Sequence, residues 1–414
     1  MEGIPVPLSA TSTEHARPEA PARPWRIVLL LGSLIALGPL SIDLYLPALP
    51  GLADDLDVGP SSAQLTLTGV LVGLALGQLL VGPLADIYGR RRPLLLGISA
   101  HVVASLLCAA APTIEVLHAL RVLQGAGAAA ASVVAMAVVR DLFTGSAAAA
   151  VISRLIMVMA LAPVLAPSLG SVVLTFGSWR TVFVVLAGLG VLIGLLAAAG
   201  LTETLPAERR SAPGLRPVLR GYATLLRDPV LVGFMLIASL TMAAVFAYVS
   251  GASFVLQDGF GVAEQTFGVL FGVGAVGLIV ASQANVLLLR HFSPAAILSA
   301  ALVVAALAGV VLLLDAVTGA GGLLGILVPT WVVLAMVALS GPNATALALA
   351  DHGQRAGATA ALLGAAQFAI GAVAAPVVGL GEAGSAVPMA ATMAGALVLA
   401  AVLAQVVLRK RVAS

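Results

Sequence analysis

The sequence predicts an all-α, polytopic membrane protein with twelve transmembrane helices in two pseudo-symmetric bundles of six. Of its 414 residues, 61% are hydrophobic and only 9% are charged, with a mean hydropathy of +1.13. A soluble domain carries about a quarter charged residues. Apolar stretches of the roughly 20 residues needed to cross a bilayer recur along the chain, and short charged loops separate them. Little sequence remains for a domain outside the membrane.

Hydropathy predicts six spans, a polar interval and then six more spans. The first six cover residues 27–50, 62–84, 93–111, 114–139, 147–175 and 179–201. The last six cover residues 229–250, 266–289, 294–314, 322–349, 356–380 and 386–408. The interval 202–228 is the longest polar stretch between spans and holds five arginines, so we expect a linker there. It separates an N-terminal bundle, 25–201, from a C-terminal bundle, 229–408.

The two ends of the chain are predicted to lie outside the bundles. Residues 1–24 are rich in Pro and Ala and have no apolar run, which is typical of a disordered tail. The stretch 27–49 is too long for the core of a signal peptide, so we interpret it as a retained first helix. Residues 409–414 form a short basic tail.

The distribution of basic residues predicts the topology. Eighteen of the 20 Lys and Arg side chains fall on one set of alternate loops and on the tails, whereas only Arg180 falls on the other set. The remaining one, Arg121, lies inside a span. Because loops that retain Lys and Arg stay in the cytoplasm, we expect both termini and the linker to be cytoplasmic.

Several other functions are disfavoured by the composition. Basic residues are scattered between spans and cover no single face, which argues against nucleic-acid binding. Cys108 is the only cysteine, so an intrachain disulfide and a cysteine metal cluster are excluded. Dispersed histidines without an HExxH or paired-acid motif argue against a membrane enzyme. Polar rings and filter loops typical of channels do not occur. We expect a carrier that has no cofactor or bound metal.

Asp43 lies in the string SIDLYLPALP, near the outer end of the first predicted helix. An ionised carboxylate within a bilayer costs about 3 kcal/mol on insertion scales, so it must be protonated, paired or in contact with a wet cavity. It is the only acidic residue clearly within a span. We therefore expect Asp43 to carry a coupled proton. The alternative is that it lies at the outer interface and caps or solvates the helix end.

Arg121 lies about a third of the way into the fourth predicted helix. A guanidinium remains charged and needs acceptors or water. It is either a charge in a central cavity that interacts with Asp43 or substrate, or a structural group bonded to helix-end carbonyls. Gln124 shares its helix face. The expected cavity-lining residues, for which ordinary interhelical packing is the alternative, are Tyr45, Gln124, Met242, Phe246, Asn343 and Gln367.

The turn GPLADIYGRRR, residues 82–92, is predicted to emerge from the membrane between two spans. Its charges lie near Asp141, which follows the fourth span in VVRDLF, so we expect ion pairs that latch the cytoplasmic helix ends together. Surface ion pairs contribute only about 0–1 kcal/mol, so a latch matters only where two conformations are nearly balanced. The predicted latch comprises Gly82, Asp86, Gly89, Arg90 and Asp141.

Several motifs together resemble a known family. GPLADIYGRRRPL resembles the loop between helices 2 and 3 of the major facilitator superfamily, and RVLQGAGAAAASVV resembles its helix 4 motif. LAPVLAPSLGS is similar to the helix 5 motif of the antiporter branch. SIDLYLPALP and ETLPAERR narrow the resemblance to the bicyclomycin and chloramphenicol resistance (Bcr/CflA) exporters. The resemblance covers about residues 25–408, although Ile87, Ala166 and Ser171 depart from the family's usual residues.

The resemblance implies the major facilitator fold and export of amphipathic drugs or antibiotics in exchange for protons by alternating access. Asp43 would be the coupling carboxylate and Arg121 its partner. A cytoplasmic charge relay would consist of Asp86, Arg90 and Asp141. Helix 5 would be shaped by Pro163, Pro167 and Gly170.

The resemblance also implies a monomer in the inner membrane of a bacterium. Its expected partners are protons, a small organic substrate and the lipid bilayer, with no nucleic acid. A transporter of a physiological metabolite remains the nearest alternative, because nothing in the spans fixes the substrate or the direction of transport.

Overall fold

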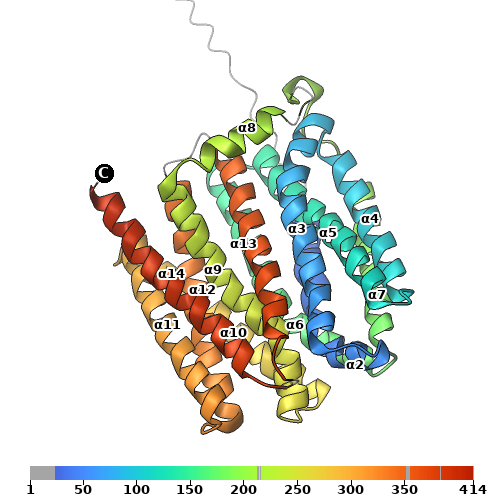
Figure 1. Cartoon of the computed structure of the whole chain (residues 1–414). Helices are drawn as coiled ribbons and strands as arrows, with labels where there is room; N and C mark the ends of the chain where they lie inside the picture. Colours follow the sequence, from blue (N-terminus) through green and yellow to red (C-terminus); the bar gives the residue numbers. More distant parts are fainter. Residues whose placement is uncertain (1–23, 212–213, 215, 351–354, 383, 414) are drawn as a thin grey trace, which may run out of the picture.

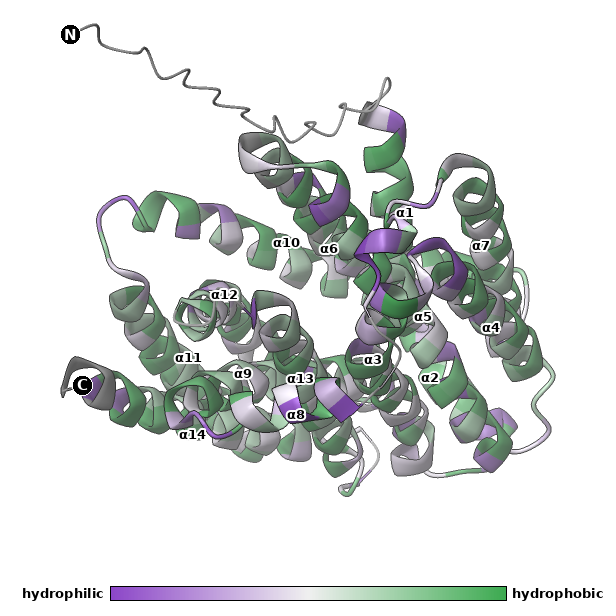
Figure 2. Ribbon diagram, turned by 90° about the horizontal axis from the view of Figure 1, so that it is seen from above, coloured by the Kyte–Doolittle hydropathy of each residue, from purple (hydrophilic) through white to green (hydrophobic). Residues whose placement is uncertain are grey.

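A computed structural model describes residues 24–211, 214, 216–350, 355–382 and 384–413. Within these ranges, twelve helices are long and apolar enough to cross a membrane, which confirms the predicted number. Figure 2 shows hydrophobic residues along most of their length. The predicted disordered tail lies outside the described residues except for Pro24, where the first helix begins.

The spanning helices form two groups of six, which Figure 1 shows side by side. The N-terminal group contains α1 (Pro24–Asp43) with its continuations η1 (Leu46–Ala48) and α2 (Leu49–Asp55), α3 (Pro60–Tyr88), α4 (Arg91–Ala109), α5 (Ile114–Leu142), α6 (Gly145–Leu174) and α7 (Trp179–Gly200). The C-terminal group contains α9 (Pro229–Phe254) with its continuation η3 (Val255–Gly259), α10 (Glu264–Leu288), α11 (Pro294–Thr318), α12 (Gly322–Leu349), α13 (Ala356–Val378) and α14 (Val387–Ala413).

The first span is interrupted, whereas the sequence predicted one continuous stretch from 27 to 50. Its regular α-helix ends at Asp43, and a short 3₁₀ helix and α2 continue it. Pro47 lacks an N–H and cannot donate the helical hydrogen bond to the carbonyl of Asp43. The break therefore places the Asp43 carboxylate at a helix end inside the protein.

Small residues bring the helices of a bundle into close contact. A Cβ at Gly73 of α3 would collide with the Val122 carbonyl of α5, and one at Gly125 would collide with the Val70 carbonyl. Glycine at both positions therefore lets the two backbones touch. Between the bundles, α3 packs against α13 and α6 packs against α10.

The interval 202–228 contains two elements that the sequence analysis did not predict, η2 (Ala207–Arg209) and α8 (Arg216–Leu225). Helix α8 lies across the ends of the spans (Figure 1). It buries Tyr222 and Leu225, and the Tyr222 hydroxyl donates a hydrogen bond of 3.1 Å to the Leu79 carbonyl of α3. At the chain end, α14 continues to Ala413, so residues 409–413 extend the last helix and do not form a separate tail.

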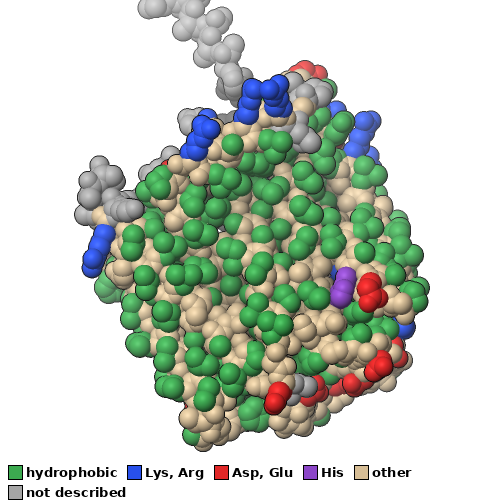
Figure 3. Space-filling model, in the orientation of Figure 1, with side chains coloured by type: hydrophobic (Ala, Val, Ile, Leu, Met, Phe, Trp, Pro, Cys, Tyr) green, Lys and Arg blue, Asp and Glu red, His purple; other side chains and the backbone are tan. Residues whose placement is uncertain are grey.

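Charged side chains are separated between the two ends of the molecule. On the face drawn in Figure 3, Lys and Arg gather at the end that carries α8, whereas Asp and Glu gather toward the opposite end. These are called the basic end and the acidic end below. This separation is the one that the alternating loops predict.

Candidate functional site

Asp43 is the last residue of α1, and only 5% of its surface is exposed. No described residue donates a hydrogen bond to its carboxylate or forms an ion pair with it. The buried position differs from that of the solvated cap at the membrane interface, which was the alternative interpretation. An acidic group without a partner in such a place is costly when ionised. Asp43 is therefore suited to bind a proton or a ligand.

The backbone of α1 determines which way Asp43 points. Ser41 lies on one face of the last turn of α1, and Tyr45 follows just beyond the end of the helix. The Ser41 carbonyl accepts a hydrogen bond from Arg121 at 3.0 Å, and the Tyr45 hydroxyl lies 3.0 Å from the Thr66 hydroxyl, so this face packs against the interior of the N-terminal bundle. Asp43 lies two residues after Ser41, about 200° around the helix, and so points away from that interior.

Arg121 is completely buried inside the N-terminal bundle. Its Nε donates to the Thr66 carbonyl at 3.2 Å, and one terminal nitrogen donates to the carbonyls of Ser41, at 3.0 Å, and of the Gln124 side chain, at 2.5 Å. Its guanidinium also lies over the rings of Tyr45, at 4.9 Å, and Phe183, at 5.5 Å. Acceptors and aromatic faces thus compensate the charge.

The expected pairing of Arg121 with Asp43 does not occur among the described residues. The two side chains lie on opposite sides of the end of α1, since Arg121 bonds to the face that carries Ser41 and Asp43 points away from it. The structure instead gives Arg121 the structural role of the alternative, with main-chain carbonyls as acceptors, although only that of Ser41 lies at a helix end.

Two of the expected cavity residues belong to the same internal network. The Gln124 side chain accepts from Arg121 and donates to the Ser105 hydroxyl at 2.8 Å, and the Tyr45 ring packs against the Arg121 guanidinium. Ser105 in turn donates to the His101 carbonyl at 2.7 Å. Tyr45 and Gln124 are therefore occupied within the N-terminal bundle.

The remaining cavity candidates come from the C-terminal bundle. Asn343 of α12 donates to the Asn285 side chain of α10 at 2.7 Å, so it joins helices within its own bundle. Phe246 of α9 contacts Phe368 of α13, with ring centroids 6.1 Å apart. Met242 and Gln367 are half-buried. The aromatic pair and these two neighbours remain candidates for contact with an apolar substrate.

The helix 5 motif shapes α6 at the level of Asp43. Pro163 and Pro167 lie inside α6. A Cβ at Gly170 would collide with the Leu44 carbonyl and contact Pro47, so glycine allows α6 to pack closely against the end of α1. Ser171, which departs from the family motif, donates to the Glu264 carbonyl of α10 at 2.8 Å.

Further hydrogen bonds join the bundles near Asp43. Ser253 of α9 donates to the Leu46 carbonyl at 2.7 Å, and Gln257 donates to the Pro47 carbonyl at 3.3 Å. Gln64 of α3 donates to the Ser250 carbonyl at 3.1 Å. These bonds hold the two bundles together just beyond Asp43, on its acidic-end side.

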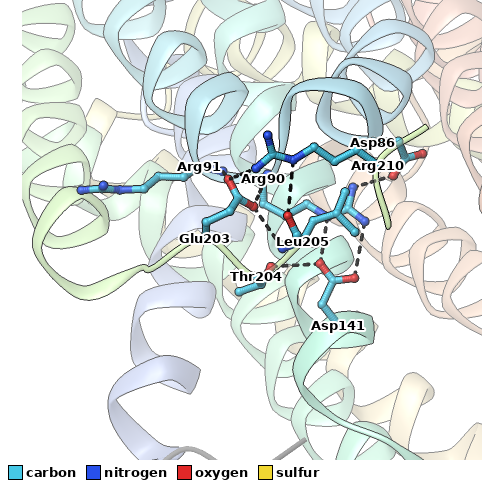
Figure 4. A network of polar contacts seen from close by, with 8 residues as sticks. All are labelled: Asp86, Arg90, Arg91, Asp141, Glu203, Thr204, Leu205 and Arg210. Atoms are coloured by element: carbon cyan, nitrogen blue, oxygen red, sulfur yellow. Dashed lines mark hydrogen bonds and ion pairs between the residues drawn. The ribbon is translucent and has the colours of Figure 1, made fainter. Parts of the chain in front are cut away.

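A cluster of ion pairs lies at the basic end (Figure 4). Arg90 donates to Asp141 at 2.8 Å and to Asp86 at 2.5 Å. The side chains of Arg90 and Asp141 are only 8% and 10% exposed, whereas that of Asp86 is 51% exposed. The ion pairs thus join α3, the turn and α5, as the sequence predicted, but all three belong to one bundle.

One glycine gives the turn its shape. Gly89 has a φ of +88°, a backbone conformation that residues with a side chain rarely adopt. Gly82 lies within α3, where a Cβ would make only an ordinary contact with Val133 of α5 at 3.9 Å. The turn is therefore fixed by its backbone as well as by its charges.

Glu203, Thr204 and Arg210 complete this cluster, although the sequence analysis assigned them no role. Glu203 accepts backbone N–H bonds from Arg90, at 2.7 Å, and from Arg91, at 3.3 Å. Burial alone would raise the pKa of Glu203, but these N–H groups, that of Leu205 and the charge of Arg210 outweigh it and lower the pKa. Thr204 donates to Asp141 at 2.9 Å. The charged residues of the string ETLPAERR, which follows the sixth span, were the feature of the sequence from which this part of the cluster could have been predicted.

The ion-pair cluster predicts unequal effects from its two aspartates. Asp141→Asn leaves the buried Arg90 guanidinium with a weaker partner and should lower the free energy of unfolding by about 2 kcal/mol. Asp86→Asn changes an exposed pair and should cost less than about 1 kcal/mol. Thermal unfolding of the purified variants measures both. Equal losses would contradict the assignment of Asp141 as the principal partner of Arg90.

Comparison with known proteins identifies the family. The model of the Major Facilitator Superfamily matches residues 29–376. The chain belongs to the major facilitator superfamily. This facilitator is 39% identical to "Uncharacterized MFS-type transporter YdgK" of Bacillus subtilis (strain 168) over 89% of its own length and 91% of the relative. It is 34% identical to "Bicyclomycin resistance protein homolog" of Haemophilus influenzae over 93% and 96% of the two chains.

Solved structures support the same fold. The crystal structure of a D-xylose-proton symporter is similar, with a TM-score of 0.73 over 92% of this facilitator and 97% of that chain. The two sequences are only 15% identical, so the likeness concerns the fold alone. Its membership of the major facilitator superfamily makes this chain a membrane transporter and not an enzyme.

Proposed function

We propose that this facilitator exports small amphipathic organic molecules, including antibiotics, in exchange for protons. Its resemblance to the Bcr/CflA exporters and its similarity to a bicyclomycin resistance protein homolog support drug export. In this proposal the bundles at 25–201 and 229–408 rock around a site between them, and the linker 202–228 connects them. Both termini and the basic end face the cytoplasm of a bacterium, and the protein acts as a monomer.

The observation that carries the proposal is the buried, unpaired carboxyl group of Asp43. A carrier that exchanges a proton for a substrate needs an ionisable group that water reaches from one side at a time. Asp43 lies where α1 is interrupted, and the hydrogen bonds of Ser253 and Gln257 separate it from the acidic end. Opening of the bundles at that end would let water reach the carboxyl group.

The test is transport by everted membrane vesicles from cells that express the chain. Substrates are first identified by a resistance screen of antibiotics that includes bicyclomycin and chloramphenicol. An imposed pH gradient should then drive uptake of each screened drug into everted vesicles, and an uncoupler should abolish it. Uptake that is insensitive to the gradient and the uncoupler would refute proton exchange.

A transporter of a physiological metabolite is the alternative that the same experiment separates. In that case expression would change no resistance, while a pH gradient would still drive uptake of some metabolite. The half-buried aromatic and methionine side chains of α9 and α13 favour an apolar substrate over a polar metabolite.

A further inference from the structure

Tyr248 of α9 has a buried hydroxyl without a partner. The residue is only 3% exposed, and no described group forms a hydrogen bond with the phenol oxygen. Its ring is held by Phe271 of α10, with centroids 5.0 Å apart and planes 17° from parallel. Leaving a buried polar group unpaired is costly, so such a group commonly has a role in another state of the protein.

Hydrogen bonds between the bundles place Tyr248 beside Asp43. The Leu46 carbonyl, three residues after Asp43, accepts from Ser253, five residues after Tyr248. Both α1 and α9 run from the basic end toward the acidic end (Figure 1). Asp43 and Tyr248 precede the two bonded residues, so both lie on the basic-end side of this contact, about one helical turn or slightly more away from it. The charge of Asp43 also influences the Tyr248 hydroxyl electrostatically, in keeping with this placement.

The other polar groups on the elements packed around Asp43 bond elsewhere, apart from one terminal nitrogen of Arg121 that has no partner among the described residues. The charge of Arg121 in α5 interacts electrostatically with Tyr45 and Cys108, on the side of α1 away from Asp43. Helix α6 presents Gly170 to the end of α1, and Ser171 bonds to Glu264. On α3, Thr66 bonds to Tyr45 and Gln64 bonds to Ser250. Among the described residues, Tyr248 is therefore a donor without a partner on the α9 side of Asp43.

We propose that the Tyr248 hydroxyl donates a hydrogen bond to Asp43 when the carboxyl group loses its proton. The bond would connect α1 to α9 and therefore one bundle to the other. No such bond exists in the present arrangement of the described residues, in which each group is unpaired. Tyr248 is thus a positioning residue that links the charge of Asp43 to the contact between bundles. This inference rests on the proposed role of Asp43 as the proton carrier.

The test uses Tyr248→Phe, which removes only the hydroxyl and keeps the ring against Phe271. Infrared spectra of the purified chain in lipid vesicles should contain a band from the protonated Asp43 carboxyl group, identified by its absence in Asp43→Asn. In Tyr248→Phe the pH at which half of this band is lost should move upward by about one unit, because the charged form has lost a donor.

The matched control is Tyr45→Phe. The Tyr45 hydroxyl bonds to that of Thr66 in α3, inside the N-terminal bundle and away from Asp43. This control should leave the midpoint of the Asp43 band unchanged. An identical midpoint in Tyr248→Phe and the unaltered protein would overturn the inference, as would an equal shift in both Phe variants. The measurement needs no substrate, so a shift confined to Tyr248→Phe would stand even if drug export were disproved.

Discussion

Asp43→Asn should abolish drug transport driven by a pH gradient while leaving the protein folded. Asparagine has nearly the shape of aspartate but cannot bind and release a proton. The exchange of a proton for a drug molecule therefore cannot be completed. The carboxylate has no hydrogen bond or ion pair with the described residues, and its replacement therefore breaks no structural contact of the described chain. Uptake into everted vesicles should fall to the level of vesicles without the protein, with an unchanged thermal unfolding midpoint.

Asp57→Asn is the matched control for that experiment. Asp57 is exposed near the acidic end and has a φ of +50°, a conformation that asparagine tolerates well. Transport by this variant should equal that of the unaltered chain. If Asp43→Asn still concentrates drug in response to a pH gradient, Asp43 does not carry the proton.

Arg121→Ala should destabilise the N-terminal bundle by about 3 kcal/mol or more. The substitution leaves the carbonyls of Thr66 and Ser41 without this donor, and each unpaired buried group costs about 1–3 kcal/mol. It also removes the side chain that fills the space between the rings of Tyr45 and Phe183, which adds the cost of a cavity. Purified protein should unfold at a distinctly lower temperature and be less abundant in the membrane.

Arg121→Lys and Arg180→Ala separate a structural role from a role in transport. Lysine keeps the charge but cannot span the same acceptors and rings, so it should recover only part of the stability. Arg180 is a partly exposed arginine that bonds to the Ala109 and Ala111 carbonyls, and its loss should cost less than that of the fully buried Arg121. A folded Arg121→Ala protein of normal stability that fails to transport would show instead that the charge serves the substrate or the proton.

The sequence determined the spans because hydropathy is a local property of the chain. Runs of apolar residues set where helices cross, and Asp228 and Ser293 cap helices that begin at Pro229 and Pro294. The alternating distribution of Lys and Arg predicted the separation of charges between the two ends. Asp43, Arg90 and Asp141 were identifiable because charged residues in or beside apolar spans are costly and rare.

Only the tertiary structure decided which groups meet. Arg121 bonds to main-chain carbonyls, which every residue carries, so no pattern of side chains distinguishes them from other acceptors. The face of α1 that carries Asp43 became known only when Ser41 and Tyr45 were found to pack inside the N-terminal bundle. The proposed pairing of Asp43 with Tyr248 depends on how two separate bundles dock. Contacts between residues some 200 positions apart arise from packing, and local sequence does not encode them.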